Sequence, residues 1–206
     1  MQLGFYFDQT RCIGCNACTV SCKDYNHVAP GVVRWRKHEN HSKVNNKSVF
    51  ENLTMSCNHC EDPACIKACG LGAIIKRPNG IVYVDRNLCQ KLQGCIQACP
   101  FAAAHIADDN QEPVKKETWQ VDHPMQKCKG CWELVESTGQ KPVCVQACPT
   151  RALDWDDINK LRRMYPDAVR LNKKDFPYAY VNNDNDTKPS FFIRKRKPLK
   201  ITSLNK

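Results

Sequence analysis

The sequence predicts an α+β protein made of two small modules, each with short β-hairpins and short helices around groups of cysteines, followed by an irregular C-terminal extension. Three observations support this fold class. The 206 residues contain 15 cysteines, which recur in four runs. Each run closes on two cysteines about one helical turn apart. Between the second and third runs, two β-prone segments flank Asn79-Gly80, which is a strong hairpin signal.

The cysteine runs have the spacing of iron–sulfur ligands. The first, second and fourth runs hold four cysteines each, whereas the third run has leucine where its second cysteine belongs. In chain order, the runs are Cys12, Cys15, Cys18 and Cys22; Cys57, Cys60, Cys65 and Cys69; Cys89, Leu92, Cys95 and Cys99; and Cys128, Cys131, Cys144 and Cys148. The odd cysteine count and the absence of a signal-peptide pattern argue against a disulfide framework.

The residues around these runs predict the secondary structure. Alternating apolar residues from Leu3 to Phe7 predict a first strand. The x3 spacing that closes each run predicts a short helix leading away from the cysteine loop. Pro100 and Pro149 then turn the chain after two of these helices. Residues 73–85 predict the hairpin.

The spacing also predicts how the runs combine. A tight loop places three thiolates around a four-iron cubane, so the fourth must come from elsewhere; in two-cluster ferredoxins it comes from the partner run. Only the hairpin separates the second and third runs, so we pair these two and pair the first with the fourth. Within each pair, the last cysteine of one run is expected to bind the cluster of the other run, an exchange that we call the crossing of ligands. The crossing predicts four sites: site A with Cys12, Cys15, Cys18 and Cys148; site B with Cys22, Cys128, Cys131 and Cys144; site C with Cys57, Cys60, Cys65 and Cys99; and site D with Cys69, Cys89 and Cys95.

Leu92 occupies the remaining corner of site D. Because leucine cannot ligate iron, we expect a 3Fe-4S cluster at site D and 4Fe-4S clusters at sites A, B and C. The fourth run taken alone also resembles a zinc ribbon, so structural zinc remains a minor alternative.

The predicted domain organisation places all four sites in residues 1–155. An outer module comprises about 1–50 and 105–155, and an inner module about 51–104. Residues 156–206 carry 13 Lys or Arg against 6 Asp, and are interpreted as a solvated basic tail or a partner-docking extension. The formal charge of +10 is largely offset by roughly −8 from four clusters, which weakens a nucleic-acid interpretation. No apolar run is long enough to span a membrane.

Few other polar residues indicate chemistry. His59 lies inside the second run, where it can hydrogen-bond a cluster sulfur. His38, His41 and His105 have no matching ligand partners and are interpreted as surface residues. No phosphate loop, paired-carboxylate pattern or nucleophile motif is apparent. We therefore expect no catalytic residues.

Several motifs together resemble a known family. They are Phe7-Asp8-x3-Cys12-Ile-Gly-Cys15, Cys57-Asn-His-Cys60-Glu-Asp-Pro63, Gly80-Ile-Val-x-Val-Asp85 and the run from Cys128 to Pro149. Across residues 3–155 the chain resembles the iron–sulfur subunit of dimethyl sulfoxide reductase-type molybdoenzymes. The resemblance implies a double ferredoxin-like fold and a row of clusters between a molybdopterin-bearing catalytic subunit and an integral-membrane anchor. Sites A and B would face the catalytic subunit. Leu92 departs from the family's sixteen-cysteine pattern, as in nitrate-reductase-like relatives that carry a three-iron cluster.

We therefore predict an electron-transfer subunit that relays single electrons between a quinone-linked membrane partner and a molybdenum or tungsten site. One alternative is a soluble polyferredoxin-like carrier for a hydrogenase or formate dehydrogenase. Another, from a different class, is a zinc-stabilised nucleic-acid-binding protein. The subunit is expected at the periphery of a membrane complex, either on the cytoplasmic side or on the periplasmic side by export with its partner.

Overall fold

A four-stranded sheet forms the framework of the protein, for which a computed structural model describes residues 1–44, 47–112, 115–174 and 187–196. Its strand order is β6 (Leu153–Asp157), β1 (Leu3–Asp8), β8 (Phe191–Arg194) and β7 (Val169–Arg170). Strand β1 runs antiparallel to β6 and parallel to β8. All six β1 residues are buried, so the strand predicted near the N-terminus is confirmed and is central to the sheet.

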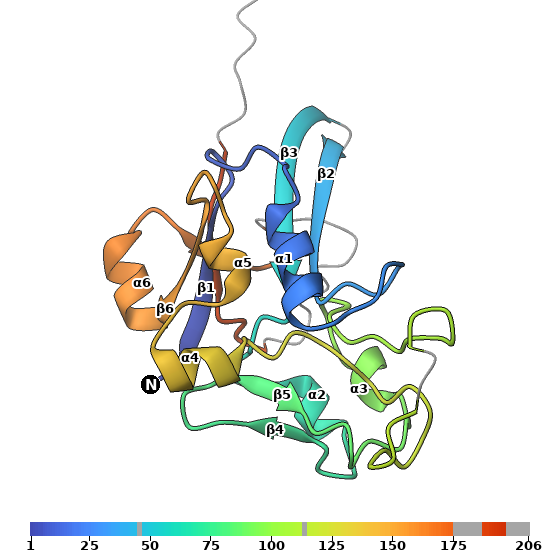
Figure 1. Ribbon diagram of the computed structural model, residues 1–206. Coiled ribbons are helices and arrows are strands. Elements are labelled where there is room, and N and C mark those ends of the chain that lie inside the picture. Colours follow the sequence, from blue (N-terminus) through green and yellow to red (C-terminus); the bar gives the residue numbers. More distant parts are fainter. Residues whose placement is uncertain (45–46, 113–114, 175–186, 197–206) are drawn as a thin grey trace, which may run out of the picture.

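Two hairpins carry the cysteine loops, and Figure 1 shows them in different parts of the molecule. Strands β2 (Arg36–Val44) and β3 (Lys47–Ser56) form the longer hairpin, and β3 leads directly into Cys57. Strands β4 (Ile74–Lys76) and β5 (Val82–Val84) form the shorter one, and Gly80 in its turn has φ +86°. A positive φ is the reason that glycine suits this turn, and the predicted hairpin is confirmed.

Short helices follow the cysteine loops as the x3 spacing predicts. They are α1 (Ala17–Tyr25), α2 (Ala64–Lys67), α3 (Gly94–Gln97) and α5 (Val143–Gln146). Helix α1 packs against α5, and α2 packs against α3. This pairing joins the first run to the fourth and the second to the third. Two further helices, α4 (Trp132–Thr138) and α6 (Ile158–Met164), lie outside the pattern.

The α+β class and the ferredoxin-like modules are confirmed, but the extension from residue 156 is not irregular where the structure describes it. It contributes α6, β7 and β8 to the fold. Phe191, Phe192 and Ile193 are 1%, 4% and 0% exposed, and β8 pairs along β1. A four-residue apolar strand is easily overlooked in a basic segment, because its partner strand lies at the other end of the sequence. The end of the basic run, from residue 197, lies outside the described residues.

Close approach between β1 and β8 makes Gly4 a sensitive position. A Cβ atom built on Gly4 would lie 2.4 Å from the Ser190 carbonyl oxygen and 2.8 Å from Ile158 Cγ2. Because backbone must move to relieve this contact, we expect Gly4→Ala to destabilise the protein by about 1–3 kcal/mol. Thermal unfolding at a fixed scan rate measures the change. Gly70→Ala is the matched control, since a Cβ there meets nothing within 4 Å; equal unfolding temperatures for the two variants would contradict the expectation.

Candidate metal centres

The four cysteine loops share one backbone conformation. The residue two positions after the first cysteine of each run has a left-handed φ: +73° at Gly14, +43° at His59, +63° at Lys91 and +64° at Gly130. Such turns point successive backbone N–H groups into a concave space that suits an anion. The loop around Leu92 keeps this conformation, although a left-handed φ is unfavourable for lysine. It is therefore still shaped as a ligand loop.

The structure gathers the predicted ligands into four groups of thiols. Burial raises the pKa of one thiol in each group most strongly. The next largest effects that raise the same pKa come from the other thiols of that group. Cys12 is influenced by Cys18, Cys148 and Cys15; Cys22 by Cys128, Cys144 and Cys131; Cys60 by Cys57, Cys99 and Cys65; and Cys95 by Cys69 and Cys89. The members of these groups are the residues that the crossing assigns to sites A, B, C and D.

Electrostatic influences between thiols of different groups place the sites in the order A, B, C, D. The pKa of Cys144 in site B is raised to about 11, first by burial, with a contribution from Cys18 in site A. The pKa of Cys128 in site B is raised by burial and then by Cys57 in site C. The pKa of Cys65 in site C is raised to about 12, first by burial, with a contribution from Cys95 in site D. Each site therefore neighbours the next.

The thiols of three sites surround small cavities, and do not converge on one point. Separate cavities are lined by the cysteines of site A, of site C and of site D. Within the described ranges, no three His, Cys, Asp or Glu side chains are arranged to hold a single metal ion. Crowded, buried thiols are costly to ionise alone, whereas a cluster binds them as thiolates and removes that cost. The residues present thus fit a polynuclear cluster.

Backbone amides point at several sulfurs. The N–H groups of Gly130 and Met125 donate to the thiols of Cys128 and Cys89 at 3.4 Å. Residues four positions beyond a closing cysteine do the same: Ala103 N–H donates to Cys99 at 3.5 Å, and Ala152 N–H to Cys148 at 3.2 Å. Burial alone would raise the pKa of Cys148, but the Thr150 hydroxyl and the backbone amides of Leu153, Ala152 and Thr150 lower it overall. Such donors stabilise thiolates and tune metal sites.

The two ends of the series reach the surface. Cys15 of site A is exposed. Leu92 lines the site D cavity with Cys69, Cys89 and Cys95, and its side chain is 68% exposed. Neither Lys91 nor Gln93 beside it adds a thiol. Site D therefore gathers three cysteines, and its fourth corner faces outward.

His59 is fully buried, and it faces a neighbouring site. Its Nδ1 accepts a hydrogen bond from the Val82 N–H at 3.0 Å. The proton of the neutral ring is then on Nε2, which lies 3.8 Å from Cys128 Sγ and can donate to it. Burial, and then the charge of Lys127, hold the pKa of His59 well below its usual value. A histidine from the site C loop thus contacts a sulfur of site B.

Sequence reasoning missed two buried cations, Arg36 and Lys127, which are 1% and 3% exposed. Arg36 donates to the Thr54 and Ser56 hydroxyls at 3.4 and 2.9 Å, and its guanidinium lies 4.4 Å from the centre of the Phe5 ring. Burial alone would lower the pKa of Arg36, but cysteines of sites A and B raise it overall. Burial alone would likewise lower the pKa of Lys127, but cysteines of sites B and C raise it overall, and its Nζ lies 3.3 Å from Cys57 Sγ. The excess of basic residues in the sequence was the only signal, and it does not say which of them are internal.

Two histidines predicted to be surface residues are partly buried. His38 lines the cavity of site A and lies 3.1 Å from Asn52 Oδ1 through its Nε2. Its strand pairing with β3 carries it there, which no local pattern indicates. His105 is half-buried, and burial lowers its pKa. The side chain of His41 lies outside the described residues.

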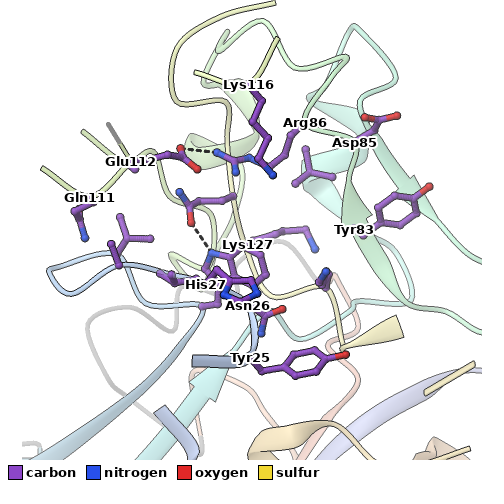
Figure 2. A pocket seen from close by; sticks show the side chains of 18 of the residues that line it. Tyr25, Asn26, His27, Tyr83, Asp85, Arg86, Gln111, Glu112, Lys116 and Lys127 are labelled. Atoms are coloured by element: carbon purple, nitrogen blue, oxygen red, sulfur yellow. Dashed lines mark hydrogen bonds and ion pairs between the residues drawn. The ribbon is translucent and has the colours of Figure 1, made fainter. Parts of the chain in front are cut away.

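A further cavity has no cysteine among its lining residues. It is a cleft of about 720 Å³ between the end of α1 and the end of β5. Its lining includes Tyr25, Asn26, His27, Tyr83, Asp85, Arg86, Glu112, Lys116 and Lys127. Figure 2 shows these side chains around it, with Arg86 paired to Glu112. The cleft reaches Lys127 from the outside and is separate from the thiol cavities.

The fold and the four thiol groups indicate an iron–sulfur protein. Residues 49–158 match the model of the 4Fe-4S dicluster domain family. The protein is 39% identical over 201 residues to the B subunit of anaerobic dimethyl sulfoxide reductase from Escherichia coli, covering 94% of this protein and 88% of the relative. It is 40% identical to the corresponding subunit from Haemophilus influenzae, covering 80% and 78%. It is 36% identical to the thiosulfate reductase electron transfer subunit PhsB of Salmonella typhi, covering 74% of each.

The chain therefore belongs to the family of iron–sulfur electron-transfer subunits of dimethyl sulfoxide reductase-type enzymes. It is a non-catalytic subunit that carries iron–sulfur clusters and serves a catalytic partner. None of the helices in the described part of the chain has the length and apolar character that a membrane span requires.

Proposed function

We propose that this subunit relays electrons along sites A, B, C and D between a molybdopterin-containing catalytic subunit and a quinone-linked integral-membrane anchor. The observation that supports the proposal is the ordered series of thiol groups, in which, for each pair of neighbouring sites, a thiol of one site raises the pKa of a thiol in the other. Iron–sulfur clusters supply one-electron chemistry when bound. The chain's own residues hold them in sequence, exclude water from the middle sites and leave the two ends accessible.

Sites A, B and C each have four thiols, and we assign a 4Fe-4S cluster to each. Site D has three thiols beside Leu92, and we assign it a 3Fe-4S cluster. The cluster at site A would be held by Cys12, Cys15, Cys18 and Cys148. The clusters at sites B and C would be held by the four thiols assigned to each of those sites. The match to the dicluster family includes residues 128–148, which favours iron–sulfur ligation over zinc for the fourth run.

We further propose that site A faces the catalytic partner and site D the membrane partner, within a peripheral arm of a membrane complex. Exposed apolar side chains accompany both ends: Ile13 and Val20 near site A are 67% and 63% exposed, and Leu88 and Leu92 near site D are 43% and 68% exposed. Exposed apolar side chains at the two ends are consistent with protein contacts there.

Anaerobic purification from the native organism tests the proposal. We expect a brown protein with broad visible absorbance that bleaches on reduction, and co-purification with a large molybdopterin protein. A chain that purifies with clusters but with no large partner would support the soluble polyferredoxin-like carrier. A colourless protein that contains zinc would contradict the proposed function.

A further inference from the structure

Lys127 occupies the boundary between sites B and C. The residue immediately precedes Cys128 of site B, yet its Nζ lies 3.3 Å from Sγ of Cys57 in site C. The same nitrogen donates to the Cys128 carbonyl at 3.1 Å and to the Val82 carbonyl. Val82 is also the residue whose N–H binds His59. One side chain thus connects the two modules at the point where their cysteine sites meet.

The contacts suit a charged lysine. A neutral amine has two hydrogens, whereas an ammonium group has three to donate. Lys127 has three acceptors: the two carbonyls and the Cys57 sulfur. No carboxylate is among these contacts, although Lys129, two residues on, pairs with Glu133. The positive charge of Lys127 is thus directed at cysteine sulfur and backbone carbonyls, and although the residue borders the cleft it is only 3% exposed, so that solvent screens the charge weakly.

We propose that Lys127 sets the reduction potentials of sites B and C together, as a positioning residue whose buried charge favours the reduced state of both. Reduction adds one negative charge to a cluster, and a fixed cation nearby stabilises the added electron. Site C should be affected more, because Nζ touches one of its sulfurs. The inference rests on the proposed function, since it presumes clusters at both sites.

Lys127→Met tests the inference in the assembled complex, because methionine fills similar space without a charge. We expect unchanged iron content and a lower potential at two of the three four-iron clusters. At a fixed ambient potential, the ratio of reduced to oxidised cluster at site C should fall about tenfold, which is about 59 mV for one electron. The shift at site B should be smaller. The remaining four-iron potential and the three-iron potential should not move. EPR-monitored redox titration measures all four.

Lys160→Met is the matched control. It removes the same charge from an exposed side chain, 54% accessible and paired with Asp156, on α6, so none of the potentials should change. If Lys127→Met fails to assemble, Lys127→Gln makes the same comparison, because its amide can still donate to one of the carbonyls. Four unchanged potentials, an equal shift in all four, or loss of iron in both Lys127 variants would overturn the inference. A wild-type protein without iron–sulfur clusters would instead overturn the proposed function.

Discussion

Leu92→Cys is expected to convert site D from a three-iron to a four-iron cluster. The loop around Leu92 already has the left-handed residues Lys91 and Gln93, at φ +63° and +62°, and the ligand loop of site A has Gly14 and Asn16 at +73° and +60° in the equivalent places. A thiol at position 92 would therefore be presented by a loop of the same shape. Iron content should rise by about one per chain.

EPR of the oxidised protein provides the measurement for Leu92→Cys, since the three-iron signal should disappear and a new signal should appear on reduction. Leu92→Ser is the control, because a neutral hydroxyl of similar size to the thiol is a poor ligand for iron. Persistence of the three-iron signal in Leu92→Cys, at unchanged iron content, would show that position 92 is not the open corner of the cluster.

The second large effect is expected from removing two cysteines at once, which tests the crossing of ligands. Cys22 belongs to the first run and Cys131 to the fourth, yet both lie in the thiol group of site B. Cys22→Ala with Cys131→Ala should leave this site two ligands, so its cluster is lost with about four irons. The other three clusters should keep their EPR signals.

Cys15→Ala with Cys22→Ala is the matched pair, and its expected outcome is different. These residues share the first run but belong to sites A and B. Each site then keeps three thiols, so both should become three-iron clusters and iron should fall by only about two. If each run bound its own cluster without crossing, the results would be exchanged: Cys15→Ala with Cys22→Ala would lose about four irons, and Cys22→Ala with Cys131→Ala only about two.

Local features of the sequence were sufficient to predict much of the fold. The β1 strand, the β4–β5 hairpin and the short helix after each cysteine loop all follow from patterns within a few residues. The grouping of the thiols also followed from spacing, because a three-ligand loop requires a ligand from elsewhere and the hairpin selects which runs are neighbours. The type of cluster in each group and the cysteines that bind it remain predictions, which the experiments above test.

Features that depend on distant segments could not be predicted. Strand β8 pairs in parallel with β1 although Phe191 and Phe5 are at opposite ends of the chain, and a short apolar run does not identify its partner. The burial of Arg36 and Lys127 likewise depends on strands and loops that meet only in the folded protein. Exposed and buried lysines look alike in a sequence. His38 was misjudged for the same reason, since the β2–β3 register places it beside site A.

The central claim is that the chain holds four clusters in crossed sites, one of them with three irons. Iron analysis of the anaerobically purified wild-type protein, combined with EPR of the oxidised state, tests it most directly. We expect about fifteen irons per chain and one three-iron signal. About sixteen irons with no three-iron signal would contradict the assignment of site D, and zinc in place of iron would contradict the account as a whole.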